Sequence, residues 1–223
     1  MTALIQPPPS PPPSMPSRQM QDLVDRFFTM QCRYSAAIRE VRTKLEILDE
    51  EFQMRHQRNP IHHMQSRMKS LPSIIQKLQR KGLEPSLQNA VEHLTDIAGI
   101  RVICSYLDDI YTIAGLLKEQ DDITLLRERD YIKDPKPNGY RSLHLIISVP
   151  VFLAEGKLFI PVEVQIRTIA MDFWASLEHH IRYKEIKQIP PELSQELAMA
   201  AEDIARLDVK MQNIYDAVQT LEE

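Results

Sequence analysis

A basic segment that contains no acidic residue lies between Asn59 and Leu83 and could bind phosphate groups. Its five lysine and arginine residues are Arg67, Lys69, Lys77, Arg80 and Lys81. A helix over this segment would point Ser73 and Lys77, which are four residues apart, in the same direction. A solvated basic surface is the alternative, and it is the more common origin of such a segment.

Phosphates would have to be held by side chains in this protein. The chain has five glycines, and neither a GxxxxGK[ST] nor a GxGxxG motif occurs. Binding by the backbone amides of a glycine-rich loop is therefore excluded.

Two carboxylates are candidates for metal binding. Asp96 precedes a predicted buried strand, and Glu163 lies on the polar face of a later one. An acid in such a position is costly to desolvate unless it meets a cation or another partner. If both converge, they could hold Mg²⁺ between substrate phosphates. Pairing of Glu163 with Arg167 or His144 on the same face remains the alternative.

The segment KDPKPNGYRSLH (133–144) predicts a tight Asn138-Gly139 turn that displays an aromatic ring among cations. The residues that it presents are Lys136, Tyr140, Arg141 and His144. A tyrosine beside cations suits stacking on a nucleotide base with phosphates alongside. A hairpin whose tyrosine binds nothing is the alternative.

The elements that must position these residues predict a mixed α/β fold, with about five strands in a mixed sheet and long helices at both ends. Predicted strands span 97–106, 123–132, 142–149 and 157–167. Predicted helices span 17–55, 71–82, 108–119 with Asp108 as cap, and 169–183. The first helix carries an apolar stripe of Ile38, Val41, Leu45, Leu48 and Phe52. Strict alternation in the last two strands puts Glu163, Gln165 and Arg167 on one face.

A last helix is predicted from Pro191, and it carries a heptad repeat. Its apolar positions are Leu193, Leu197, Ala200, Ile204, Leu207, Met211, Ile214, Val218 and Leu221. Packing against the first helix is one interpretation. We favour an interface between subunits, since so regular a stripe lies at a chain end.

Composition sets the remaining limits. The 223 residues have a formal net charge of −4, which gives no reason to expect DNA or other broad polyanion binding. Cys32 and Cys104 predict reduced thiols in the cytoplasm, and no apolar run approaches a membrane span. Prolines dominate residues 1–17, which we expect to be a disordered tail, with a ligand for a proline-binding module as the alternative. The predicted organisation is tail 1–17, core domain 18–190 and oligomerisation helix 191–223.

Four strings resemble the RelA/SpoT-type (p)ppGpp synthetase domain. They are HLTDIAGIRVIC (93–104), RDYIKDPKPNGYRSLH (129–144), VEVQIRT (162–168) and AMDFWASLEH (170–179). The resemblance covers roughly residues 20–220, and the chain looks most similar to the small alarmone synthetases of the RelQ and RelP type. It implies a nucleotidyltransferase-like fold, a cytoplasmic enzyme of the stringent response and a homotetramer.

The resemblance also implies roles by position. Residues that match ATP-binding groups are Arg67, Lys69, Ser73, Lys77 and Arg101. Residues that match groups around GDP or GTP are Arg129, Lys136, Tyr140, His144, Gln165, Asp172 and Glu178. Asp96 and Glu163 match Mg²⁺ ligands, and Glu163 also matches the general base.

In the implied reaction a pyrophosphate moves from ATP to the ribose 3′-hydroxyl of GDP or GTP, and AMP leaves. Arg67 and Arg101 would enclose the adenine, and Tyr140 would stack on guanine. The Glu178 carboxylate would accept from the N1–H and N2–H groups of guanine. No His-Asp dipeptide occurs, so the family's hydrolase domain is missing and synthesis alone is expected.

Departures from the family pattern limit what can be carried over. Asp172 stands where many relatives have asparagine, and an ionised aspartate cannot donate a hydrogen bond, so the preference between GDP and GTP stays open. His63, Gln65, Arg42 and Glu46 replace the regulatory residues of relatives that pppGpp activates. We therefore do not expect activation by pppGpp.

Two other functions are alternatives to this synthetase activity. A catalytically silent module of the same fold could hold nucleotides or single-stranded RNA, although RNA binding is not predicted. A metallohydrolase would have to use His62-His63 or His179-His180. Neighbouring histidines diverge on a helix and no HExxH spacing exists, which disfavours that chemistry.

Overall fold

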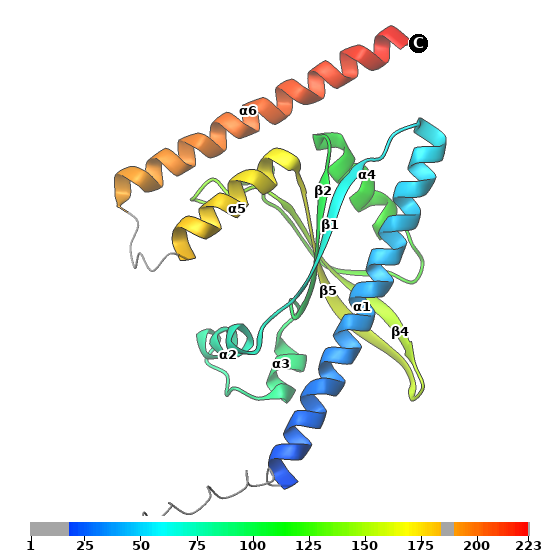
Figure 1. The fold of residues 1–223 in the computed structure, drawn as a ribbon, viewed down its shortest axis with the longest axis vertical. Helices are drawn as coiled ribbons and strands as arrows, with labels where there is room; N and C mark the ends of the chain where they lie inside the picture. The colour runs from blue at the N-terminus through cyan, green and yellow to red at the C-terminus, as the bar shows by residue number, and fades with distance from the viewer. Residues whose placement is uncertain (1–17, 184–189, 223) are drawn as a thin grey trace, which may run out of the picture.

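The computed structural model of the chain describes residues 18–183 and 190–222. This part of the chain forms one mixed sheet of five strands in the order β1-β2-β5-β4-β3 (Figure 1). The strands are β1 (Ile61–Met68), β2 (Ala98–Cys104), β3 (Thr124–Asp130), β4 (Leu143–Leu153) and β5 (Gly156–Thr168). The helices are α1 (Arg18–His56), α2 (Leu71–Arg80), α3 (Leu87–His93), α4 (Leu107–Lys118), α5 (Ile169–Tyr183) and α6 (Pro191–Glu222). The predicted fold class is confirmed.

Parallel pairing at the centre of the sheet brings together two strands that are far apart in sequence. β2 and β5 run parallel, and the pairs β1–β2, β4–β5 and β3–β4 run antiparallel. Gly99 of β2 lies opposite Arg67 on β1 and opposite Glu163 on β5. Arg67 of the basic segment and Glu163 therefore lie on either side of Gly99, one strand apart from it on each side.

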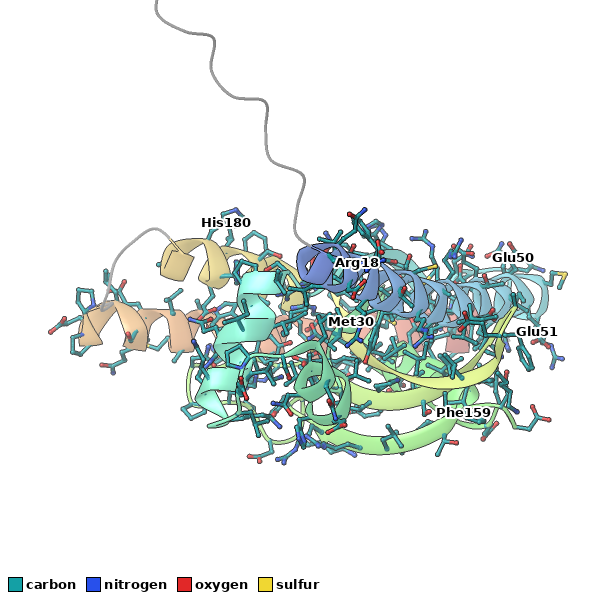
Figure 2. The ribbon with its side chains drawn as sticks, turned by 90° about the horizontal axis from the view of Figure 1, so that it is seen from below. Arg18, Met30, Glu50, Glu51, Phe159 and His180 are labelled. Carbon is teal, nitrogen blue, oxygen red and sulfur yellow. The ribbon has the colours of Figure 1, made fainter. Side chains whose placement is uncertain are left out.

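The long first helix covers one face of the sheet, as its apolar stripe predicts. Val41 and Leu45 have no exposed surface and belong to the same cluster as Val162 of β5. Figure 2 shows α1 lying across the strands with Met30 on its sheet side. Because side chains alternate along a strand, burial of Val162 against α1 leaves Glu163 on the opposite face.

β1 and α3 were not predicted from the sequence. β1 reads IHHMQSRM, and Ile61 is the residue of this strand that is buried. It forms at the edge of the sheet through its ladder with β2, so a distant segment rather than an apolar pattern decides its structure. His62 and His63 therefore lie on a strand, not on a helix as that argument assumed.

The predicted cap of α4 was wrong. The helix begins at Leu107, one residue before Asp108, with Tyr106 at the N-cap. The Asp109 carboxylate accepts a hydrogen bond from the Tyr106 backbone N–H at 3.2 Å and a bidentate pair from the Arg58 guanidinium at 2.7 and 3.0 Å. A buried ion pair thus holds this helix start, which a local cap search cannot find.

α6 uses one face within the chain and leaves another exposed. It packs against α5 and α4, and its buried residues are Ala201, Asp208 and Gln212. Positions of the heptad repeat that remain exposed are Leu193, Leu207, Met211, Ile214, Val218 and Leu221. In the described part of the chain, α1 therefore does not cover this apolar stripe.

The expected tail, residues 1–17, lies outside the described residues. In the two described ranges no helix combines the length and the apolar character that a membrane span requires.

Candidate active site

A row of polar side chains crosses all five strands on the face away from α1. Residues in direct register share a face of the sheet. The row consists of Gln65, Arg101, Gln165, His144 and Arg129. A second row beside it joins Arg67 and Glu163 through Gly99. The sheet thus places groups predicted for ATP and for the guanine nucleotide side by side.

A cleft of about 630 Å³ lies over these rows, between the sheet and α5. Sequence-predicted residues that line it are Arg67, Arg101, Lys136, Tyr140, His144, Glu163, Gln165 and Glu178. Lys69, Ser73, Lys77, Asp96, Arg129 and Asp172 do not line it. The cleft is large enough for a nucleotide, and most of the residues that line it are of charged or polar type.

Asp96 binds two lysines at one end of the site. Its Oδ2 lies 2.5 Å from Lys77 Nζ and 2.9 Å from Lys69 Nζ. Burial alone would raise the pKa of Asp96, but hydrogen bonds and charge from Lys77 and Lys69 hold it below its ordinary value. Ser73 lies one turn of α2 before Lys77, and its hydroxyl bonds with Ser70 at 2.9 Å. These cations converge as predicted.

Glu163 is the central carboxylate of the cleft. The Gln165 side chain donates to its Oε2 at 2.9 Å, and His144 Nδ1 lies 3.6 Å from its Oε1. Burial alone would raise the pKa of Glu163, yet His144 and Gln165 hold it below its ordinary value, against the charge of Asp96. Glu163 is therefore ionised at neutral pH. Its alternative partner, His144, does contact it, so the two predicted interpretations are compatible.

The turn between β3 and β4 brings an aromatic ring and a cation to the other end of the cleft. Lys136 Nζ lies 4.5 Å from the centre of the Tyr140 ring, within cation–π range. The Tyr140 hydroxyl bonds with His144 Nε2 at 2.9 Å, and the Asn138 amide donates to Glu178 at 3.0 Å. Burial lowers the pKa of Lys136, although Glu163 and Glu178 oppose this shift.

Arg167 is a site residue that the sequence analysis did not assign. It is 1% exposed, it lines the cleft, and its guanidinium lies 5.9 Å from the centre of the Tyr140 ring. Burial lowers its pKa, although nearby Asp172 opposes this. The alternation that placed Glu163 and Gln165 on the polar face includes Arg167 as well, so the signal was present.

Asp172 contacts arginines rather than the cleft. Its Oδ1 lies 3.3 Å from Arg167 Nε and 3.7 Å from Arg101 Nη1. Arg101 also donates to Gln65 at 3.2 Å. Asp172 is thus paired with two arginines that line the cleft, although it does not line the cleft itself. Arg129 is exposed and in register with His144, at the rim of the site.

Buried polar atoms without hydrogen-bond partners concentrate in this site. Among residues 18–183 and 190–222 there are four such side-chain atoms, namely Asp96 Oδ1, Arg101 Nε, Arg167 Nε and Asp172 Oδ1. An unmade buried hydrogen bond costs ~1–3 kcal/mol. Arg167 Nε and Asp172 Oδ1 face each other as an ion pair at 3.3 Å, so Asp96 Oδ1 and Arg101 Nε are the two atoms that a ligand from outside the chain would satisfy.

Asp96 and Glu163 are the carboxylates of the site that offer oxygen ligands to a divalent cation. Asp96 has an unused buried oxygen, and it is close enough to Glu163 for its charge to raise the pKa of that residue. In the part of the chain that the structure describes, no three His, Cys, Asp or Glu side chains group as a metal cage. Mg²⁺ typically takes one or two carboxylates and completes its shell with phosphates and water.

Comparison with known proteins identifies relatives over most of the chain. Residues 66–188 match the region found in RelA/SpoT proteins. The chain is 49% identical over 181 residues to the GTP pyrophosphokinase YwaC of Bacillus subtilis strain 168, which covers 81% of this chain and 86% of that protein.

Solved structures of small alarmone synthetases share the fold of this chain. The crystal structure of small alarmone synthetase 2 from Bacillus subtilis has a TM-score of 0.78 and 46% identity, covering 86% of this chain and 98% of that one. Small alarmone synthetase 1 from the same organism, bound to its product pppGpp, has a TM-score of 0.80 and 34% identity, covering 87% and 98%.

Proposed function

This chain belongs to the RelA/SpoT synthetase family, and from that premise we propose that it is a GTP pyrophosphokinase that makes (p)ppGpp. It transfers the β,γ-pyrophosphate of ATP to the ribose 3′-hydroxyl of GDP or GTP and releases AMP. The observation that carries this proposal is the position of Glu163, an ionised carboxylate between a cation cluster and an aromatic turn.

The donor subsite is the end of the site built from β1, α2 and β2. In this structure the ammonium groups of Lys69 and Lys77 pair with Asp96. When ATP binds, its triphosphate would replace Asp96 as their partner. Arg67 and Arg101 lie on neighbouring strands, where two guanidinium planes could enclose adenine. Ser73 shares the face of α2 with Lys77 and would donate to a phosphate oxygen.

The acceptor subsite is the end near the β3–β4 turn. Tyr140 would stack on guanine while Lys136 and Arg129 attract the 5′-phosphates. Glu178 would exchange its bond from Asn138 for the N1–H and N2–H donors of guanine. Adenine presents an acceptor at the corresponding ring nitrogen, so it would leave a polar group unmet.

Proton transfer would fall to Glu163. Its lowered pKa keeps the carboxylate ready to accept the 3′-hydroxyl proton, and Gln165 and His144 orient it. Asp96 and Glu163 are the residues that would hold Mg²⁺. When bound, that ion neutralises charge on the phosphates of the donor.

Incubation of the purified chain with ATP, GDP and Mg²⁺, and separately with GTP, tests the function. We expect AMP and a 3′-pyrophosphorylated guanosine nucleotide in equal amounts. Binding of both nucleotides without AMP release would instead favour the silent binding module. Replacing Mg²⁺ by EDTA is expected to stop product formation.

We further propose that the exposed heptad face of α6 joins subunits, as part of a homotetramer. Its exposed leucine, isoleucine and valine side chains support this, because water contact of so continuous a stripe is costly. Removal of α6 by truncation after Pro191 would test this interface, but it would also expose Trp174, which packs against Leu197. Substitution of exposed α6 residues avoids this second effect.

Leu207→Gln combined with Ile214→Gln is expected to lower the mass of the particle in light scattering. Both side chains are about half exposed in the single chain, at 50% and 47%, so the fold itself should tolerate the change. Val209→Gln is the matched control, because Val209 is 51% exposed on the same helix but outside the heptad positions. An unchanged mass of the double variant would refute this interface.

A further inference from the structure

The turn that carries Lys136 and Tyr140 packs against α6. Gly139 has a φ of +87°, and a Cβ added to it would lie 2.5 Å from the Cβ of Ala201. Ala201 is 3% exposed. Side-chain carbons do not approach so closely, so the turn meets the helix at a distance that glycine alone allows.

Arg141 bonds the turn and the helix at the same time. Its guanidinium donates to the Gly139 carbonyl at 3.2 Å, to the Ala201 carbonyl at 3.3 Å and to the Glu202 carboxylate at 2.9 Å. The Arg141 side chain is 11% exposed. Charge-assisted bonds of this kind hold their geometry more firmly than neutral ones do.

The same stretch of α6 is fixed to the strand that carries Glu163. The Thr168 hydroxyl, at the end of β5, donates to Asp208 at 2.7 Å. The Trp174 indole N–H of α5 donates to the Leu197 carbonyl at 2.9 Å. Their partners on α6, Leu197 and Asp208, flank Ala201 in sequence. The stretch of α6 that contacts the turn is therefore also bonded to α5 and to the end of β5.

We propose that α6 is the positioning element of the guanine-nucleotide subsite, with Ala201 and Arg141 as its positioning residues. Within the described residues none of α6 lines the cleft, so α6 acts on the subsite through the elements that it contacts. The turn is the one of these elements that carries Tyr140 and Lys136. The contact sets where the Tyr140 ring lies relative to Glu163. This inference rests on the proposed function, which assigns the acceptor to Tyr140.

Ala201→Val tests the proposal, because two added methyl groups would push the turn away from α6. We expect the KM for GDP or GTP to rise about tenfold, which equals ~1.4 kcal/mol. The KM for ATP and the kcat at saturating acceptor should change less than about twofold. Equal rises in both KM values, or a lower melting temperature with unchanged KM values, would overturn it.

Three further variants distinguish positioning of the turn from general damage to the fold. Glu202→Ala removes one bond of Arg141 at a side chain that is 60% exposed, and should raise the acceptor KM about twofold to threefold without lowering the melting temperature. Ala217→Val puts the same added bulk at an exposed position of α6 and should change neither KM. Tyr140→Ala marks the full loss of the acceptor contact.

Binding measurements separate this inference from the proposed function. Titration calorimetry with GDP alone requires no turnover. Weaker GDP binding by the Ala201→Val variant supports positioning by α6 even if the wild-type chain forms no AMP. Unchanged GDP binding by this variant overturns the inference even if the wild-type chain is a fully active synthetase.

Discussion

Glu163→Gln lowers kcat by about a thousandfold or more and leaves nucleotide affinities within about threefold, the expected result if Glu163 is the general base. Glutamine keeps the size of the side chain and can still contact Gln165 and His144. It cannot accept the proton of the 3′-hydroxyl, because its amide is not basic. Initial rates of AMP release, together with equilibrium titration of ATP and GDP, measure both quantities.

Glu155→Gln is the matched control for this change. Glu155 lies in the β4–β5 hairpin, its side chain is 85% exposed, and it bonds weakly with Arg33 at 3.5 Å. The control should keep full activity. Loss of both nucleotide affinities in the Glu163→Gln variant, rather than loss of kcat, would show that the carboxylate serves mainly to hold the cleft together.

Asp96→Asn is expected to have two opposite effects. Turnover should fall about a hundredfold or more, because a neutral amide is a poor magnesium ligand. In EDTA, however, the variant should bind ATP several-fold more tightly than the wild type, because Lys69 and Lys77 lose the carboxylate that now competes for them. Titration calorimetry of ATP with and without Mg²⁺ measures both.

A surface ion pair of the same kind supplies the control. Lys44 Nζ lies 2.7 Å from Asp122, so Asp122→Asn also releases a lysine, but outside the cleft. That variant should match the wild type in both titrations. If Asp96→Asn weakened ATP binding in EDTA as well, Asp96 would be ordering the lysines rather than competing with the triphosphate.

Local patterns predicted the polar sheet face and five of the six helices of the described residues, with α3 missed and the start of α4 misplaced by one residue. The stripe of α1 and the alternation of β5 each follow from burial of one side of one element, so a single segment contains the signal. The extent of α5, 169–183, matches the prediction. Glu163, Gln165 and Arg167 share a face for the same local reason.

Features that depend on pairing between segments far apart in the sequence could not be predicted from local patterns. β1 is a polar edge strand that forms because β2 lies beside it. The five-strand row requires the registers of four strand pairs, none of which the sequence states. The contacts of Asp172 with Arg101 and Arg167 depend on how α5 packs on the sheet, which no local pattern states. Its assignment to the guanine nucleotide stays a prediction.

The buried face and the exposed face of α6 would link two binding events through one helix. If its buried face sets acceptor affinity and its exposed face joins subunits, a restraint that acceptor binding places on the helix changes the free energy of assembly, and assembly changes the free energy of acceptor binding. Such coupling is reciprocal, so guanine nucleotide would tighten assembly by the same factor by which assembly tightens nucleotide binding. Enzyme concentration would then act as an effector, and the acceptor KM would fall as the protein becomes more abundant.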